Sequence, residues 1–396
     1  MLVQTADVLI IGAGIAGASC AYHLAKAAPG LKITIVEKEP LPGTGATRFS
    51  TGGIRHQFST ELNIRLTQRS LQAFQRWPEE MGGDIGFRQH GYLFVTASTE
   101  TLAGLKAAAE LQKSLGVPTH IAEGPAVAGR YAALFPGIRT EDLAGGSFCP
   151  LDGSADPSLV LAGYLRQAAR LGVKLVTGCH VTSLTRPESD DPDKVSGAQT
   201  STGPISAGTV ILTAGPTLAS LAATAGVDLP IRPYRRQVFV FWTPPELSQI
   251  DPPLLVDLDT GWYAHREKGG ALLMGGTDRD TAPGTNQMVD WPGLDKVAAA
   301  ALKRVPRLAE AGLVRAYVGI RALTPDFHAV VGRPAGLSGL LVAGGFSGHG
   351  FMHSPAVGEI VAALAVGRPV PFEIDLAHLS PDRFDAEHVV AERTVF

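Results

Sequence analysis

Val8-Leu-Ile-Ile-Gly12-Ala-Gly14-Ile-Ala-Gly17 is the stretch of sequence that decides the fold. Its first four residues are apolar and mostly β-branched, which favours a short buried strand of a parallel sheet. The glycines that follow have the spacing of a pyrophosphate-binding turn. Gly12 permits the tight turn, Gly14 lets the backbone approach phosphates, and Gly17 allows close packing of helix on strand. We therefore expect a strand that turns directly into a phosphate-binding helix.

The residues after this turn complete a βαβ unit. An alanine-rich stretch to about Ala28 predicts a helix, which Pro29-Gly30 ends. Ile33–Val36 predicts a second strand, and Glu37 follows it, 20 positions after Gly17. An acidic side chain at this place can accept a hydrogen bond from a ribose hydroxyl, and it disfavours the 2′-phosphate of NADP. The order of strand, helix, strand and acid predicts a dinucleotide site.

Two further glycine-rich segments bear on which dinucleotide binds. Residues 43–53 are rich in small and hydroxyl side chains, and Ala343–His353 stands immediately before a predicted helix. The start of a helix can stabilise the negative charge of a reduced flavin. This second helix start, some 300 residues downstream, favours FAD over NAD. An NAD-linked dehydrogenase with two ordinary strand-to-helix turns is the alternative.

Composition narrows the class of protein. The 396 residues are 45% hydrophobic and 18% charged, enough for two or three folded domains. A formal net charge of -3 gives no basic surface for nucleic acid. Cys20, Cys149 and Cys179 are far apart and predict neither a disulfide framework nor a zinc site. The apolar run Val8–Ala18 is shorter than the ~20 residues of a spanning helix, so a soluble cytoplasmic protein is expected, with weak membrane or subunit association left open.

Periodicity along the chain predicts a fold of the α/β (α+β) class. Helical spacing covers residues 100–115, 158–171 and 352–366, whereas strands are predicted over 173–176, 181–184, 210–212, 237–242, 262–265, 271–275, 313–320 and 339–343. Pro187–Asp193 and Pro244–Pro253 read as surface loops. We expect a Rossmann-like FAD-binding domain built from discontinuous segments, residues 1–85, 145–225 and 326–396. An inserted antiparallel β-sheet domain for substrate would take residues 86–144 and 226–325.

Taken together, the motifs resemble those of the D-amino-acid oxidase-type FAD-dependent oxidoreductases. This family includes glycine oxidase, monomeric sarcosine oxidase and the sarcosine oxidase beta subunit. The resemblance rests on Gly12–Gly17 with Glu37, Ser50–Phe58, Val210–Gly215, Gly319–Asp326 and Gly344–Phe351. It implies bound FAD and hydride removal from the carbon that bears the amine of a small amino acid or N-alkyl amino acid, such as a D-amino acid, glycine or sarcosine. The imine formed would be hydrolysed, and dioxygen, a quinone or another acceptor would take the electrons.

The resemblance also implies roles for individual residues. Arg55 and Arg321 match arginines that bind the substrate carboxylate, which a planar guanidinium can grip through two parallel hydrogen bonds. Tyr263 matches a tyrosine of the substrate pocket, and His349 is expected beside the flavin and in the catalytic site. From the residues alone, each arginine could instead form an ordinary ion pair. The FAD contacts implied are Gly12, Gly14, Ile15, Ala16, Gly17, Glu37, Lys38, Thr47, Arg48, Ser50, Gly52, Gly53, Val181, Ala214, Gly215, Gly345, Gly348, His349, Gly350 and Phe351.

Several positions depart from the family pattern. Sarcosine oxidases carry a lysine where this chain has Met352, and another lysine, which promotes reaction with dioxygen, in a segment resembling Leu272–Gly275. Here the latter segment has none, and Lys268 lies upstream in a predicted hairpin loop. The flavin-linked cysteine falls near Gly319, so we expect non-covalent FAD. These differences favour a dehydrogenase slightly over an oxidase, and an FAD-containing non-catalytic subunit or assembly factor is the alternative.

No metal site is expected from the spacing of the histidines. His265, His328 and His353 do not have the separations of metal ligands. His56 adjoins Arg55, and in a strand its side chain would point to the opposite face. We therefore assign His56 no catalytic role.

Overall fold

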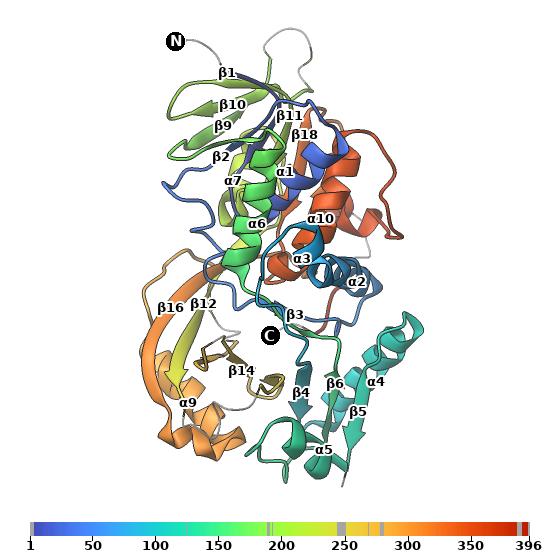
Figure 1. The fold of residues 1–396 in the computed structure, drawn as a ribbon, viewed down its shortest axis with the longest axis vertical. Coiled ribbons are helices and arrows are strands. Elements are labelled where there is room, and N and C mark those ends of the chain that lie inside the picture. The colour runs from blue at the N-terminus through green and yellow to red at the C-terminus, as the bar shows by residue number, and fades with distance from the viewer. Residues whose placement is uncertain are drawn as a thin grey trace.

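The computed structural model describes residues 4–124, 126–187, 191, 193–243, 251–267, 269–277, 281–385 and 390–394. Figure 1 shows the molecule as two parts stacked along its longest axis, each built on one eight-stranded sheet. Most of the predicted loops at 187–193 and 244–253, as well as Lys268, lie outside the described residues.

The first sheet carries the predicted βαβ unit. Its main path runs β17-β18-β11-β1-β2-β8, and β9 and β10 form a hairpin-like pair that joins at β11. Strand β1 lies between β2 and β11 and is parallel to both. The strands are β1 (Gln4–Ile11), β2 (Ile33–Val36), β8 (Lys174–Val176), β9 (Val181–Thr185), β10 (Gly197–Thr200), β11 (Ile205–Leu212), β17 (Val330–Gly332) and β18 (Leu340–Gly344).

Helices cover this sheet, and for this reason its strands are almost continuously apolar. Leu9 and Ile10 of β1 are fully buried, because a parallel sheet of this kind is covered on both faces. The helices of the upper part in Figure 1 are α1 (Ile15–Ala27), α2 (Glu61–Gln75), α3 (Trp77–Glu80), α6 (Pro157–Arg170), α7 (Leu218–Ala223) and α10 (Gly350–Ala365). The start of α6 is fixed locally, since the Asp156 carboxylate accepts hydrogen bonds from Ser158 N and Leu159 N.

The second sheet forms the lower part of the molecule (Figure 1) and runs β16-β12-β15-β14-β13-β4-β6-β5. Its pairs are antiparallel except that β4 and β13 are parallel, a departure from the antiparallel sheet expected from sequence. The strands are β4 (Tyr92–Thr96), β5 (His120–Glu123), β6 (Gly145–Cys149), β12 (Arg232–Trp242), β13 (Leu254–Asp257), β14 (Trp262–Arg266), β15 (Leu272–Gly275) and β16 (Gly312–Leu323). Helices α4 (Thr99–Ser114), α5 (Ala126–Leu134) and α9 (Pro292–Arg304) lie beside it.

The two-domain division remains a proposal, and the sheets suggest one change to it. Strand β6 pairs with β4 and β5 and belongs to the second sheet. We therefore propose that the second FAD-binding segment begins after Cys149, where the sequence-based boundary was residue 145. A short pair, β3 (Gly53–Ile54) with β7 (Gly153–Ser154), lies between the two sheets. Within the described part of the chain, no helix is long and apolar enough to cross a bilayer.

Candidate functional site

The glycine-rich turn after β1 is shaped by steric contacts. A Cβ on Gly17 would lie 2.0 Å from the Gly12 carbonyl oxygen, and one on Gly12, where φ is +104°, would lie 2.7 Å from Thr213 O. At Gly14 the situation differs, because a Cβ would meet only Thr47 Oγ1, at 3.3 Å, among the described residues. Gly12 and Gly17 are thus required by the fold, whereas Gly14 leaves a side of the turn open to a ligand.

Glu37 and Thr47 hold this turn in place. The Glu37 carboxylate accepts hydrogen bonds from Ala13 N at 2.9 Å and Glu39 N at 3.0 Å. Thr47 Oγ1 accepts one from Ile15 N at 3.0 Å. Gly14 is the N-cap of helix α1 and has no side chain to cap it, so Thr47 bonds the first N–H of the helix in its place. The next N–H groups of the first turn and the positive dipole end of the helix suit a bound phosphate.

The second glycine-rich segment has the same architecture at the same edge of the sheet. It follows β18, while Ala214-Gly215 follows β11, and β1, β11 and β18 are parallel and aligned. The N-cap of helix α10 is His349, which makes no side-chain cap hydrogen bond. Ligands of open α/β sheets bind outside the carboxyl ends of the strands. The starts of α1 and α10 and the open side of Gly14 therefore fit a dinucleotide with a flavin ring.

The remaining predicted FAD contacts differ in exposure. Thr47, Gly52, Gly53, Val181, Gly345 and Phe351 are buried, and Ser50 is partly exposed. Lys38, Arg48 and Gly348 are exposed, and Lys38 pairs with Glu39. Their contacts with FAD stay predictions.

A cavity of about 50 Å³ is lined by residues from both parts of the molecule. It contains all the predicted catalytic residues: Arg55, which follows β3, Tyr263 of β14, Arg321 of β16 and His349 at the start of α10. Its other lining residues are Ser50, Thr51, Gly53, Tyr92, Leu254, Gly348, Phe351 and Met352. Tyr92 was not predicted from the sequence, because nothing in β4 marks a tyrosine that tertiary packing brings to the cavity.

Arg55 is held by several protein groups. Its Nη1 donates to Gln57 O, and its Nη2 donates to Thr394 O at 2.7 Å and lies 3.2 Å from His349 Nε2. The guanidinium carbon lies 3.9 Å from the centre of the Phe58 ring. Burial lowers the pKa of Arg55 to about 10, and nearby Glu392 opposes this shift. The group is therefore a fixed positive charge at neutral pH.

Arg321 reaches the cavity from the second sheet. It packs over Gly348, where a Cβ would lie 3.2 Å from Arg321 Cδ. Tyr263 lies nearby; burial raises the pKa of its hydroxyl, and the charge of Arg321 opposes that effect. Burial also raises the pKa of Tyr92. Both hydroxyls keep their protons at neutral pH and can donate hydrogen bonds.

His349 is neutral and has a defined protonation state. Burial, followed by the charge of Arg55, holds the pKa of His349 well below its usual value. An arginine nitrogen can only donate, so the neighbouring His349 Nε2 must accept and the ring proton sits on Nδ1. Nδ1 is buried and has no hydrogen-bond partner among the described residues.

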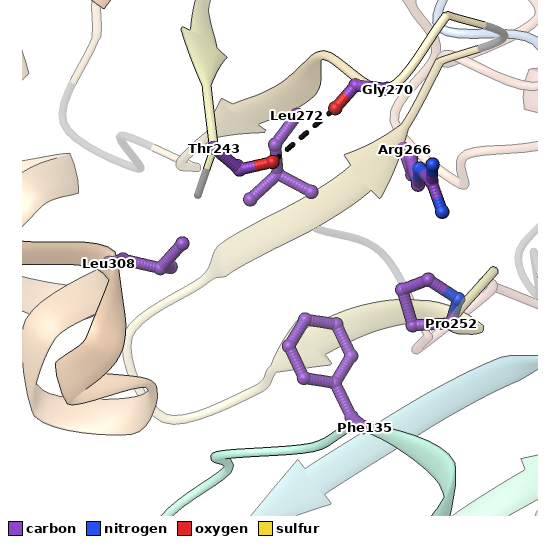
Figure 2. Close-up of a pocket in the computed structure, with 7 residues that line it drawn as sticks. All are labelled: Phe135, Thr243, Pro252, Arg266, Gly270, Leu272 and Leu308. Carbon is purple, nitrogen blue, oxygen red and sulfur yellow. Dashed lines mark hydrogen bonds between the residues drawn. The ribbon is translucent and has the colours of Figure 1, made fainter. Parts of the chain in front are cut away.

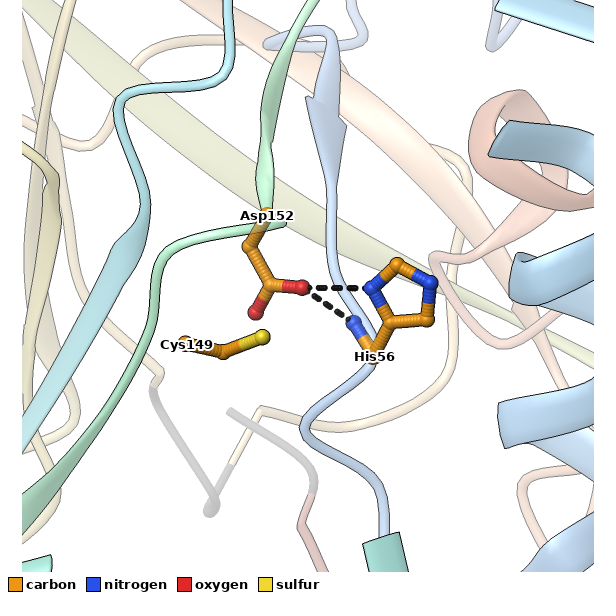
Figure 3. A group of neighbouring side chains, drawn as sticks. All are labelled: His56, Cys149 and Asp152. Atoms are coloured by element: carbon orange, nitrogen blue, oxygen red, sulfur yellow. Dashed lines mark hydrogen bonds and ion pairs between the residues drawn. The ribbon is translucent and has the colours of Figure 1, made fainter. Parts of the chain in front are cut away.

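His56 belongs to a separate, fully buried network (Figure 3). Its backbone N and its Nδ1 both contact Asp152 Oδ1, at 2.7 and 2.8 Å, and Gln57 donates to Asp152 Oδ2. Possible metal-ligand atoms of His56, Cys149 and Asp152 lie within 4.8 Å of one another. Burial raises the pKa of the Cys149 thiol, which favours its protonated form. Both Asp152 oxygens accept hydrogen bonds, so this cluster joins β3 to the end of β6.

A second cavity lies in the lower part of the molecule, away from these residues. Figure 2 shows its lining, which is mostly apolar: Phe135, Thr243, Pro252, Arg266, Gly270, Leu272 and Leu308. Its volume is about 10 Å³, about the minimum for one water molecule. It is too small to hold a substrate.

Comparison with known proteins identifies the class to which this fold and site belong. The family model described as FAD dependent oxidoreductase (DAO) matches residues 7–364. The chain therefore belongs to this family, and FAD is its cofactor.

Two individual relatives illustrate the similarity. The chain is 28% identical to mitochondrial dimethylglycine dehydrogenase of Rattus norvegicus, over 96% of this chain but only 45% of that protein. It thus spans less than half of that relative. Sarcosine oxidase subunit beta of Arthrobacter sp. is 27% identical, with 98% of this chain and 93% of the relative covered.

Solved structures agree with this assignment. L-proline dehydrogenase from P. horikoshii is 29% identical with a TM-score of 0.87, covering 97% of this chain and 99% of that one. Glycine oxidase from Geobacillus kaustophilus is 26% identical with a TM-score of 0.83, covering 98% and 100%. The predicted family and fold class are confirmed.

Proposed function

We propose that this protein oxidises the C–N bond of a small amino acid or N-alkyl amino acid. The observation that carries the proposal is the cavity in which Arg55, Arg321, Tyr263 and His349 meet beside the start of α10. The names of the relatives support it, since they are dehydrogenases and oxidases of dimethylglycine, sarcosine, proline and glycine. FAD, when bound, supplies the hydride acceptor.

The chain's own residues would hold FAD at the edge of the first sheet. The Gly12–Gly17 turn and the start of α1 suit the pyrophosphate, with Glu37 close by for a ribose hydroxyl. Gly345–Phe351 and the uncapped start of α10 suit the flavin end. The start of a helix there favours negative charge on the reduced ring.

Arginine side chains would orient the substrate. We assign the carboxylate to Arg321, supported by the charge of Arg55, because Arg321 lines the cavity and packs over Gly348 at the start of α10. A guanidinium can bind a carboxylate through two hydrogen bonds and so fixes the amino carbon in one orientation. The Tyr263 and Tyr92 hydroxyls can donate to the same group or to water.

The proton that is lost before hydride transfer would come from the substrate amine. His349 stays neutral and its Nε2 accepts from Arg55, so it is poorly placed to take a proton. The substrate must therefore react with its amine unprotonated, when the nitrogen lone pair can assist the departure of hydride. Rate should rise with pH through the amine's own pKa.

Anaerobic reduction of the flavin tests the proposal. The FAD-loaded protein should lose its yellow colour with at least one member of a panel of D-, L- and N-methyl amino acids. Propionate, which has the carboxylate but no amine, is the matched control and should leave the colour unchanged. A flavin that no member of the panel bleaches would contradict the proposal and favour the non-catalytic subunit.

Association with a further subunit is a secondary proposal. It is motivated by the relative named as a beta subunit, of which this chain covers 93%. Size-exclusion chromatography of the protein from its native source should then show a particle heavier than the purified recombinant chain.

A further inference from the structure

The last described residues of the chain, Val390–Thr394, reach Arg55, which lines the substrate cavity; we call them the C-terminal segment. The Glu392 side chain anchors it and is almost fully buried. Its Oε1 accepts from Ser59 N at 2.8 Å and Ser59 Oγ at 2.7 Å, and its Oε2 accepts from Thr60 Oγ1 and Asn63 Nδ2. One carboxylate thereby fixes the C-terminal segment to the start of α2.

The same carboxylate shapes the end of the segment. Thr394 N donates to Glu392 Oε1 at 2.9 Å, and Arg393 N donates to Ser59 Oγ at 2.8 Å. This turn aims the Thr394 carbonyl oxygen at Arg55, whose Nη2 donates to it at 2.7 Å. Arg55 is thus held by a part of the chain about 340 residues away in sequence.

Arg55 Nη2 carries two hydrogens, and both have an acceptor. One points to Thr394 O and the other to His349 Nε2. Because Nε2 accepts, Nδ1 of the neutral ring must carry the proton. A buried N–H without a partner costs free energy comparable to a lost hydrogen bond. His349 lines the cavity, so its Nδ1–H is suited to an acceptor oxygen of a bound ligand.

We propose that Glu392 is a positioning residue that acts through Thr394 and Arg55 to keep His349 in the tautomer with its proton on Nδ1. The Nδ1–H then donates to an oxygen of the ligand, which is either a carbonyl of the flavin ring or the substrate carboxylate. The identity of the ligand rests on the proposed function. The relay from Glu392 to His349 is a property of the folded chain.

Nitrogen NMR of the ¹⁵N-histidine-labelled protein tests the relay, because the two tautomers differ in which ring nitrogen bears the proton. The His349 signals are assigned with His349→Asn. The wild-type protein loaded with FAD should show Nδ1 protonated. Glu392→Gln replaces an acceptor oxygen with an NH₂ group facing Asn63, so the His349 signals should shift or divide between tautomers. Ser59→Ala removes one contact of Glu392 and should act in the same direction more weakly.

A matched control is available on the surface. Glu373 pairs with Arg65 and its side chain is 83% exposed, so Glu373→Gln removes the same charge without touching the C-terminal segment. It should leave the His349 signals unchanged. Unaltered His349 signals in both Glu392→Gln and Ser59→Ala would overturn the proposal. If Glu392→Gln does not fold, Ser59→Ala decides alone.

Adding FAD and a carboxylate separately distinguishes the two candidate acceptors of the His349 Nδ1–H hydrogen bond. A change in the Nδ1 proton signal when FAD is added to the apoprotein identifies the flavin, and a change only when propionate is added to the FAD-loaded protein identifies the carboxylate. No change in either titration would overturn the donor role of Nδ1.

The rate of flavin reduction at saturating substrate should fall about tenfold or more in Glu392→Gln, the effect of losing one hydrogen bond to a charged group. A protein that no amino acid reduces, but whose His349 tautomer follows Glu392, would reject the proposed function and keep the relay.

Discussion

Arg321 is the residue on which substrate affinity should depend most. Removing one partner of a buried charge pair costs about 2–5 kcal/mol, so Arg321→Leu should raise the substrate Kd roughly thirtyfold to several thousandfold. FAD should stay bound. Arg321→Lys should restore only part of the affinity, because an ammonium cannot form the two parallel hydrogen bonds.

The control for this variant lies on the same strand. Arg315 of β16 is exposed and rests on the Tyr317 ring, so Arg315→Leu should leave the substrate Kd unchanged. The measurement is a titration of flavin absorbance with substrate or propionate. A normal Kd for Arg321→Leu would place the carboxylate elsewhere.

Gly319 bears on how FAD is attached. A Cβ there would lie 2.8 Å from Phe49 Cβ, so the position has no room for a side chain unless Phe49 moves. Cys20, Cys149 and Cys179 are all buried. We therefore predict that acid precipitation releases all the flavin and leaves a colourless pellet; yellow remaining with the denatured protein would show a covalent bond.

His353 should make the folded state sensitive to acid. Burial lowers its pKa to about 3, from 6.5 in an unfolded chain. Between these values the unfolded chain binds a proton that the folded protein does not, so stability is complete above pH 6.5 and declines as pH falls toward 3. The slope is about 1.4 kcal/mol per pH unit for one such group.

Replacing this histidine should flatten the decline. His353→Gln keeps a group that can bond to Thr67, whose Oγ1 lies 3.1 Å from His353 Nε2, but it cannot titrate. Urea unfolding midpoints between pH 4 and 7 should fall less steeply for the variant than for the wild type. Parallel curves would show that His353 does not titrate as described.

At the scale of elements, the turn between β1 and α1 contains one glycine that folding requires, Gly17, and another, Gly14, that we expect to affect mainly cofactor binding. Gly17→Ala would place a methyl group 2.0 Å from Gly12 O and should damage both folding and FAD binding. Gly14→Ala meets only Thr47 Oγ1, at 3.3 Å, among the described residues, so the apoprotein should fold nearly normally while FAD binds more weakly. Circular dichroism of the apoproteins and FAD titration measure the two effects. Equal loss of FAD affinity and of stability in Gly14→Ala would contradict this separation.

Local patterns predicted most elements but few of their partners. The helices expected over 100–115 and 158–171 occur as Thr99–Ser114 and Pro157–Arg170, because caps and apolar spacing are local signals. The helix Glu61–Gln75 was not predicted, although its apolar residues have helical spacing. The parallel pairing of β4 with β13 joins residues about 160 apart, and no local pattern encodes such a contact.

For the candidate site, too, the sequence indicated only those residues that lie in distinctive local motifs. Motifs indicated Arg55, Arg321 and His349 because their neighbours in sequence are distinctive. Tyr92 and Glu392 carry no such signal, since only tertiary packing brings Tyr92 to the cavity and Glu392 to Ser59. The roles of all five residues remain predictions that the proposed variants test.

At the scale of the whole molecule, we expect the second sheet to influence which acceptor reoxidises the flavin. Reduced flavin reacts with dioxygen through an anionic intermediate that a nearby cation stabilises. The segment where relatives of the sarcosine oxidase type carry a lysine is β15, and here it presents the buried side chains of Leu272, Leu273 and Met274. A bound carboxylate would also offset the charge of Arg321.

We therefore predict slow reoxidation by air and faster turnover with a quinone or dye. Stopped-flow measurement of the reduced flavin with dioxygen checks this directly. A rate equal to turnover in air, with one hydrogen peroxide per substrate, would make the protein an oxidase. Leu273→Lys should then be compared with the wild type, since a new cation in β15 is expected to accelerate the reaction with dioxygen.

The position of β1 between β2 and β11 also governs how the chain can fold during translation. Its apolar strand is made first, but its partner Ile205–Leu212 emerges only about 200 residues later. At about 5–20 residues per second, that interval lasts roughly 10–40 seconds. Throughout it one edge of β1 lacks its neighbour, and the FAD-binding turn lacks Thr213, which packs against Gly12. Nascent chains of this protein should therefore depend on chaperones, and cofactor loading should wait until Ile205–Leu212 has emerged.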